Sequence, residues 1–229
     1  HTGLESPAKL GKFIYSHKVT NRHQEKDIRV NLFIPSILSW KEEGVELIQQ
    51  SRIPESEQVD LTLNLKKKQK LILRIRKPDW TDKATFIING EEEQPLLGSD
   101  GYWIIDRVWE RKNVITLRLP MHIYTENLTG TDRYVALLYG PYVLAGRMGK
   151  ENLPTTFWGK MNNTAMNKMD MAKVPVFREP VERIPTHVEV VSGEPLKFGI
   201  NLKGFEHIVL EPFYKVHFER YAVYWPITH

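Results

Sequence analysis

The sequence predicts an all-β protein: an antiparallel, jelly-roll-like β-sandwich with one short N-terminal helix. Through most of the chain, apolar residues alternate with polar ones at a period of two, which is typical of strands with one buried face. Turn signals separate these segments at intervals of roughly 8–12 residues, as in sandwiches and barrels. The opening is different, because "SPAKLGKFIY" has the capping serine, the proline and the apolar spacing of a helix.

The first half of the chain contains a succession of strand-like segments. "DIRVNLFIPS" places Ile28, Val30, Leu32 and Ile34 on one face, and Pro35 stops it. Further strands are expected in "VELIQQS", "VDLTLNL", "LILRIRKPDW", "ATFIING" and "GYWIIDRVWERKNVITLRLP". The alternation within these segments predicts one face toward a shared core. Beyond them, "RYVALLYGPYVLAG" is interpreted as two apolar runs that belong to the second β unit.

Turn signals join several of these strands. Asn89-Gly90 is a strong turn dipeptide, and Gly140-Pro141 bends the run that contains it. The basic run 66–70 lies between two predicted strands without interleaved aromatic residues, so we interpret it as a solvated hairpin tip rather than a nucleic-acid patch. The acidic run 91–93 is interpreted as a solvated turn.

The pattern breaks at residues 150–185, which are polar and rich in Met, Asn and Pro. We expect a long irregular excursion there. Alternation resumes in "THVEVV", "LKFGI", "HIVLEPFY" and "YAVYW". The expected organisation is a helix and linker at 1–27, a β-sandwich at 28–120 and a second β unit at 121–229. The C-terminal strands either stay in the second unit or return to the first sandwich.

Composition limits the chemistry available to the chain. Its 229 residues carry a net charge of only +4 and include no cysteine. Disulfides, thiolate metal sites and cysteine nucleophiles are therefore excluded within this chain. No apolar run approaches the ~18 residues that a membrane-spanning helix needs. We expect neither nucleic acid nor a membrane as a partner.

Five segments in order carry a resemblance to a known family: "IRVNLFIPS", "LILRIRKPDW" with "FIINGE", "GYWIIDRVWERKNVITLRLPM", "RYVALLYGPYVLAG" and "LEPFYKVHFERYAVYW". Together they resemble the C-terminal half of the bacterial β-L-arabinofuranosidases of glycoside hydrolase family 127. The resemblance covers most of the chain outside 150–185. It implies a parent protein with an (α/α)6 helical barrel followed by β-sandwich domains, and residues 1–27 would be the remnant of the last barrel helix and a linker.

The resemblance also implies where catalysis takes place. In the family, a zinc-bound cysteine in the barrel is the nucleophile of a retaining reaction, and a glutamate is the acid/base. This chain alone is therefore expected to be inactive and to bind no cofactor, with zinc implied for the full-length parent. Its expected partners are the N-terminal barrel, an arabinose-containing glycan through the parent, and a second copy if the protein dimerises. A periplasmic or secreted location is favoured over the cytoplasm.

Two residues are candidates for contacting a carbohydrate, and no residue is predicted to be catalytic or to bind a metal. By resemblance, Glu5 follows the lost nucleophile, although a carboxylate there also favours the helix dipole. Trp158, in the excursion, is the best candidate for an exposed ring, although such a ring also pins loops onto cores. Of Trp103 and Trp109, at least one is expected in the core. The eight histidines show no metal-ligand spacing.

Two functions follow. The first is a non-catalytic C-terminal β-sandwich portion of a glycosidase acting on L-arabinofuranosides, which supports the barrel and, in one arrangement, a dimer. It predicts an exposed apolar face at Phe13 and Ile14. The alternative is a free-standing carbohydrate-binding module, which predicts a concave polar site with an aromatic ring at its base.

Overall fold

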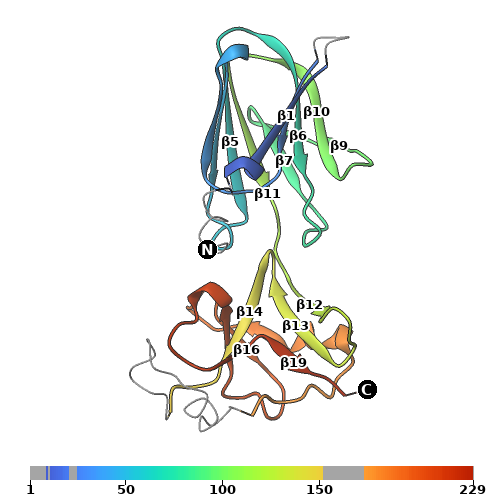
Figure 1. Ribbon diagram of the computed structural model, residues 1–229, viewed down its shortest axis with the longest axis vertical. Coiled ribbons are helices and arrows are strands. Elements are labelled where there is room, and N and C mark those ends of the chain that lie inside the picture. Colours follow the sequence, from blue (N-terminus) through green and yellow to red (C-terminus); the bar gives the residue numbers. More distant parts are fainter. Residues whose placement is uncertain (1–8, 10, 21–24, 152–172, 229) are drawn as a thin grey trace. The chain divides into compact units, whose positions relative to one another are not determined.

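The computed structural model describes residues 9, 11–20, 25–151 and 173–228. The chain divides into two compact units, His1–Met121 and His122–His229. Strands dominate both units and nearly all pair antiparallel, which confirms the all-β, sandwich-like class (Figure 1). The predicted short helix is present at residue 9 and residues 11–14, but Tyr15 already begins a strand.

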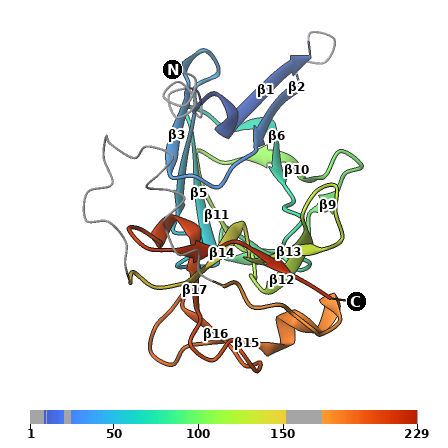
Figure 2. The same ribbon diagram turned by 60° about the horizontal axis from the view of Figure 1, so that its bottom comes forward.

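One sheet of the first unit has the strand order β1-β2-β6-β10-β9. Its strands are β1 (Tyr15–Thr20), β2 (Glu25–Val30), β6 (Gln69–Arg76), β10 (Tyr102–Trp109) and β9 (Leu96–Leu97). Figure 2 shows β1 beside β2, and β2 runs parallel to β6. The sequence predicts only helix and linker where β1 lies, because "YSHKVT" has no apolar alternation. The expected strand over 27–36 likewise stops at Val30.

The other sheet of this unit has the order β3-β4-β5-β11-β7-β8. Its strands are β3 (Ser36–Trp40), β4 (Val45–Ser51), β5 (Gln58–Leu65), β11 (Lys112–Arg118), β7 (Thr85–Ile88) and β8 (Glu91–Glu93). A 3-10 turn, η1 (Lys41–Glu43), joins β3 to β4 and ends at the left-handed Gly44. The acidic run 91–93 is thus a strand rather than a turn. Asn89 and Gly90, both at positive φ, form the predicted turn before it.

The basic run 66–70 is exposed at its lysines, as expected, but it is not a hairpin tip. β5 ends at Leu65 in one sheet and β6 begins at Gln69 in the other, so the chain crosses between the sheets here. The residues between β10 and β11 make a second crossing. Strand periodicity predicts strands but not which sheet each one joins, and this explains the wrong prediction.

The core of the first unit lies between the two sheets. β5 buries every second residue from Val59 to Leu65, as the sequence predicts. β6 supplies Leu71, Leu73 and Ile75 from the opposite sheet. Both Trp103 and Trp109 on β10 are buried, and Trp109 donates a hydrogen bond through Nε1 to the Leu71 carbonyl, at 2.9 Å. The expectation of at least one core tryptophan is therefore confirmed.

A buried glutamine binds the backbone of a connection between the two sheets. Gln49 on β4 is 1% exposed, and its Nε2 donates to the carbonyls of Leu32 (3.0 Å) and Ile34 (2.6 Å). These two carbonyls belong to the connection between β2 and β3, which are strands of different sheets. Gln49 thus pairs the Leu32 carbonyl and shares the Ile34 carbonyl with the Ser36 hydroxyl, which donates to it at 2.7 Å.

The sheet of the second unit has the order β12-β13-β14-β17-β16-β15, with β18 on β14 and β19 on β13 (Figures 1 and 2). Its strands are β12 (Ile123–Asn127), β13 (Tyr134–Tyr139), β14 (Tyr142–Arg147), β15 (Val188–Val190), β16 (Phe198–Ile200), β17 (Val209–Pro212), β18 (Tyr221–Ala222) and β19 (Tyr224–Pro226). The C-terminal strands therefore pair inside this unit, not with the first sandwich. Within the predicted irregular excursion, a 3-10 helix begins: η2 (Val181–His187).

Aromatic residues fill the core of the second unit. Phe177 and Phe205 stack at 4.4 Å between ring centroids, and the buried Trp225 contacts both rings. Gly146 on β14 leaves room for the indole, because an ideal Cβ on this residue would lie 2.5 Å from two Trp225 ring carbons. This glycine is therefore required by close packing rather than by backbone conformation.

Replacing Gln49 with methionine should lower the free energy of unfolding by about 1 kcal/mol, because the Leu32 carbonyl loses its donor while the Ile34 carbonyl keeps the Ser36 hydroxyl, at 2.7 Å. Urea unfolding at neutral pH measures the change. The neighbouring exposed Gln50 is the control, and Gln50→Met should stay within about 0.5 kcal/mol of the wild type. Equal effects of the two substitutions would contradict the assigned role of Gln49.

Gly146→Ala should destabilise the protein by about 1–3 kcal/mol, because the added methyl group overpacks the Trp225 indole. Gly199 on β16 is the matched control, since a Cβ there meets nothing within 4 Å. Gly199→Ala should be neutral or stabilise by about 0.4–1 kcal/mol, because it restricts the unfolded chain. Thermal unfolding of both variants is the measurement, and an unchanged melting temperature for Gly146→Ala would refute this packing argument.

Candidate functional site

The two residues predicted to contact a carbohydrate, Glu5 and Trp158, lie outside the described residues. The tryptophans that the structure describes do not replace them as exposed platforms. Trp103, Trp109 and Trp225 are buried, and Trp40 and Trp80 are partly buried against the first core. A binding surface in the described part must therefore use other side chains.

The described part of the chain holds no group of three or more His, Cys, Asp and Glu residues that could bind a metal ion. Because the sequence also lacks cysteine, the residues present do not fit the thiolate zinc site that the family resemblance implies. Among the carboxyl groups, the backbone N–H groups of Gly204 and Glu206 lower the pKa of Glu206. This direction is opposite to the one that a general acid requires.

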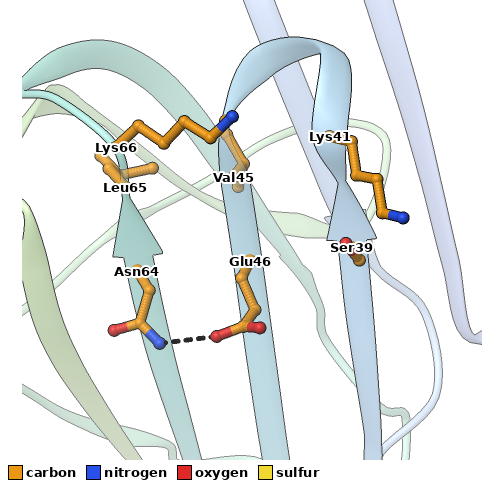
Figure 3. A pocket seen from close by; sticks show the side chains of 8 residues that line it. Ser39, Lys41, Val45, Glu46, Asn64, Leu65 and Lys66 are labelled. Atoms are coloured by element: carbon orange, nitrogen blue, oxygen red, sulfur yellow. Dashed lines mark hydrogen bonds between the residues drawn. The ribbon is translucent and has the colours of Figure 1, made fainter.

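A shallow pocket of about 290 Å³ opens beside the η1 corner of the first unit (Figure 3). Its polar lining comes from Ser39, Lys41, Glu46, Asn64 and Lys66. Asn64 Nδ2 donates to Glu46 Oε1 at 2.9 Å, across the neighbouring strands β5 and β4. This bond engages the amide and the carboxylate with each other, and the pocket lining contains no aromatic ring. The pocket is therefore a weak candidate for binding a sugar.

The outer face of the β2–β6 pair carries a network of charges. Asp27 is 8% exposed and accepts a bond from Arg74 Nε at 2.7 Å. Asp100 lies 3.4 Å from Arg74 Nη1 and 3.6 Å from Arg29 Nη2. Arg29 also lies over the ring of Tyr102 at 5.2 Å. These contacts link three strands and the loop before β10, so we interpret the network as a brace for the sheet.

A second charged cluster lies on the second unit. Arg147, at the end of β14, contacts Glu211 through Nη1 at 3.3 Å and Glu219 through Nε at 2.6 Å. The two carboxylate side chains are only 9% and 5% exposed, whereas Arg147 is 37% exposed. Lys197 lies 3.9 Å from Glu211, and its hydrogen bond to Glu194 raises the pKa of Lys197. The guanidinium is thus held in place by two shielded carboxylates and still reaches solvent.

Aromatic rings adjoin this cluster on the same face of the sheet. Tyr221 is the direct cross-strand partner of Arg147, and Glu211 is the partner of Ala145. Side chains of directly paired residues lie on one face, and here it is the face opposite the core. The Phe213 ring lies 5.0 Å from the Tyr221 ring, and the two residues are 43% and 49% exposed. Arg147, Glu211, Glu219, Phe213 and Tyr221 are called the Arg147 surface below.

The Arg147 surface was not among the sites predicted from the sequence. Tryptophan was the residue type expected to form an exposed platform, yet the exposed rings are Phe and Tyr residues within "LEPFYKVHFERYAVYW". The unusual density of aromatic residues in this segment was the available signal. Phe218, in the same segment, is a further sign of an unusual surface, and it appears only in the structure. This residue is 82% exposed, and its φ of +55° lies in a region that bulky residues rarely occupy.

The fold places this chain in a class, namely proteins that contain two consecutive all-β units. Residues 27–121 match the family described as β-L-arabinofuranosidase, GH127 middle domain. Residues 124–227 match a family described as a domain of unknown function. The first unit is therefore related to the middle domain of glycoside hydrolase family 127, in agreement with the resemblance seen in its sequence. No curated protein matches the sequence.

Three solved structures resemble this chain. A GH127 β-L-arabinofuranosidase from Geobacillus stearothermophilus T6 is 25% identical, with a TM-score of 0.53 over 61% of this chain and 22% of that one. A GH127 β-arabinofuranosidase (16% identical, TM-score 0.58) covers 90% of this chain and 35% of its own. A glycoside hydrolase (19% identical, TM-score 0.57) covers 88% and 36%. The latter two likenesses show the fold alone. The chain spans between 22% and 36% of the length of these proteins.

Arg147→Gln should destabilise the protein by about 1–3 kcal/mol at pH 7, because two shielded carboxylates lose their cation while the exposure of Arg147 moderates the loss. The control is Arg107→Gln. Arg107 has a similar exposure of 40%, but its partner Glu93 is 34% exposed. That substitution should cost less than about 1 kcal/mol. Chemical denaturation compares the two variants, and a larger loss for Arg107→Gln would contradict this account.

Proposed function

We propose that this chain is the non-catalytic β-sandwich portion of a longer glycoside hydrolase that acts on L-arabinofuranosides. The match of residues 27–121 to the GH127 middle domain carries the proposal. The lengths of the solved relatives support it, because the chain spans at most 36% of any of the three. The substrate class is supported by the Geobacillus relative, which is described as a β-L-arabinofuranosidase.

The proposal places the chemistry outside this chain. By the family resemblance, a retaining reaction uses a cysteine nucleophile, zinc and a glutamate acid/base. This sequence has no cysteine, and the described residues hold no three-ligand metal group. We therefore assign the nucleophile, the metal and the acid/base to an N-terminal helical barrel of the longer protein, and we assign no catalytic step to this chain.

In this proposal the present chain supports the barrel. Phe13 is 63% exposed, and its carbonyl accepts a bond from Asn31 Nδ2 at 3.1 Å, which anchors the helical residues to the first unit. Ile14, by contrast, is buried within the chain. Of the apolar face expected at these two positions, only Phe13 is therefore available to a partner.

The proposal also includes two broader properties of the longer protein. We propose a homodimer, which light scattering of the longer protein would refute by giving a monomer mass. We propose a periplasmic or secreted location, which cell fractionation would refute by recovering the protein in the cytoplasm. Both are independent of the hydrolytic assignment.

A carbohydrate-binding module is the second candidate function. The specific observation in its favour is the Arg147 surface, where exposed aromatic rings lie beside a fixed cation. Aromatic faces bind the C–H faces of sugars, and charged side chains bind the hydroxyl groups. This candidate differs from the first in that the chain would work alone.

The 229-residue chain should release no 4-nitrophenol from 4-nitrophenyl β-L-arabinofuranoside above the uncatalysed rate, because it lacks the nucleophile. The longer protein that contains this sequence should hydrolyse the same substrate, and a zinc chelator should remove that activity until zinc is restored. Turnover by the 229-residue chain, or an inactive longer protein, would overturn the proposed function.

A further inference from the structure

The Arg147 surface combines a pair of exposed aromatic rings with a fixed, partly exposed cation. Phe213 and Tyr221 present a pair of half-exposed rings, 5.0 Å apart between centroids. Arg147 lies directly across the β14–β18 pair from Tyr221. Large exposed aromatic side chains are unfavourable in water unless a partner covers them. The surface therefore calls for a ligand that has both apolar and polar parts.

The geometry of Arg147 shows which polar groups such a ligand meets. Glu219 engages Nε and Glu211 engages Nη1, so two contacts fix the plane of the guanidinium. The carboxylates are nearly buried while the arginine side chain stays 37% exposed. A ligand consequently meets a pre-oriented donor beside an aromatic face, with little conformational entropy left to lose.

The charges favour a neutral ligand. Two carboxylates offset the charges of Arg147 and Lys197, so the cluster does not attract anions strongly. The central arginine likewise opposes a metal ion. A neutral molecule with hydroxyl groups and C–H faces fits both the rings and the guanidinium, and sugars have this chemistry.

We propose that Phe213, Tyr221 and Arg147 form a binding site for a neutral glycan that contains furanose rings. The site rests on the proposed function for the identity of the sugar, since a β-L-arabinofuranosidase is among the solved relatives. A sugar ring stacks on Tyr221 with the Phe213 ring beside it, inclined by 52° to the Tyr221 plane, and Arg147 donates to the sugar hydroxyl groups. The second unit then holds a glycan at a site that performs no hydrolysis.

Isothermal titration calorimetry of the 229-residue chain with an arabinofuranose trisaccharide tests the site, with a glucose trisaccharide as the comparison sugar. We expect saturable binding of the arabinofuranose probe. Tyr221→Ala should weaken binding by about tenfold or more through loss of the stacking face. Phe13→Ala is the matched control, because it removes an exposed ring from the first unit, and its affinity should equal that of the wild type.

Three outcomes would overturn the site: no heat of binding with the wild-type chain, equal weakening by Tyr221→Ala and Phe13→Ala, or equal affinity for the glucose trisaccharide. The second would show non-specific binding to exposed rings, and the third would show that the site does not select furanose rings. If Tyr221→Ala lowers the melting temperature, Tyr221→Leu keeps the apolar bulk and removes only the aromatic face. A flat titration leaves the proposed function standing, because hydrolysis by the longer protein tests that function separately.

Discussion

The interleaving of apolar side chains between the two sheets of the first unit is the constraint on which its other features depend. β5 presents a valine and three leucines to the shared core, and β6 presents two leucines and an isoleucine. Because side chains alternate strictly along a strand, each crossing between sheets must deliver the next strand with its apolar set facing inward. The crossings at residues 66–68 and at the β10–β11 connection satisfy this condition. The β2–β3 connection also crosses between the sheets, and there Gln49 donates hydrogen bonds to two backbone carbonyls.

Prediction from the sequence succeeded where burial alone sets the pattern. Val59 to Leu65 on β5 and Leu71 to Ile75 on β6 were identifiable because one face is buried and the other is solvated. Prediction failed where the neighbouring strand, rather than the segment's own pattern, decides the structure. β1 has no apolar alternation and exists because β2 supplies its hydrogen bonds along its whole length. The basic run was assigned to a hairpin because periodicity carries no information about which strands pair.

The candidate site shows the same division. Exposed rings cannot be told from buried ones by residue type, so Tyr221 and the buried Trp225 looked alike in the sequence. The Arg147 surface also depends on cross-strand pairing between residues 147 and 221, a separation that no local motif encodes. Glu211 and Glu219 are eight positions apart in the sequence, and each of them contacts Arg147. The family resemblance located the chain within a protein family but did not reveal this surface.

The pairing of β1 with β2 affects where this domain can be divided from its neighbours. The family match begins at residue 27, inside β2. A chain cut at that point would lose β1 and the first residues of β2. The remainder of β2 would then become an open sheet edge, which readily pairs with other chains and promotes aggregation. Tyr15 would be lost as well, and with it the 2.9 Å hydrogen bond between its hydroxyl group and Ser36 in the opposite sheet. We therefore expect a fragment of the first unit to require β1 and to begin at or before residue 15, upstream of residue 27, where the family match begins.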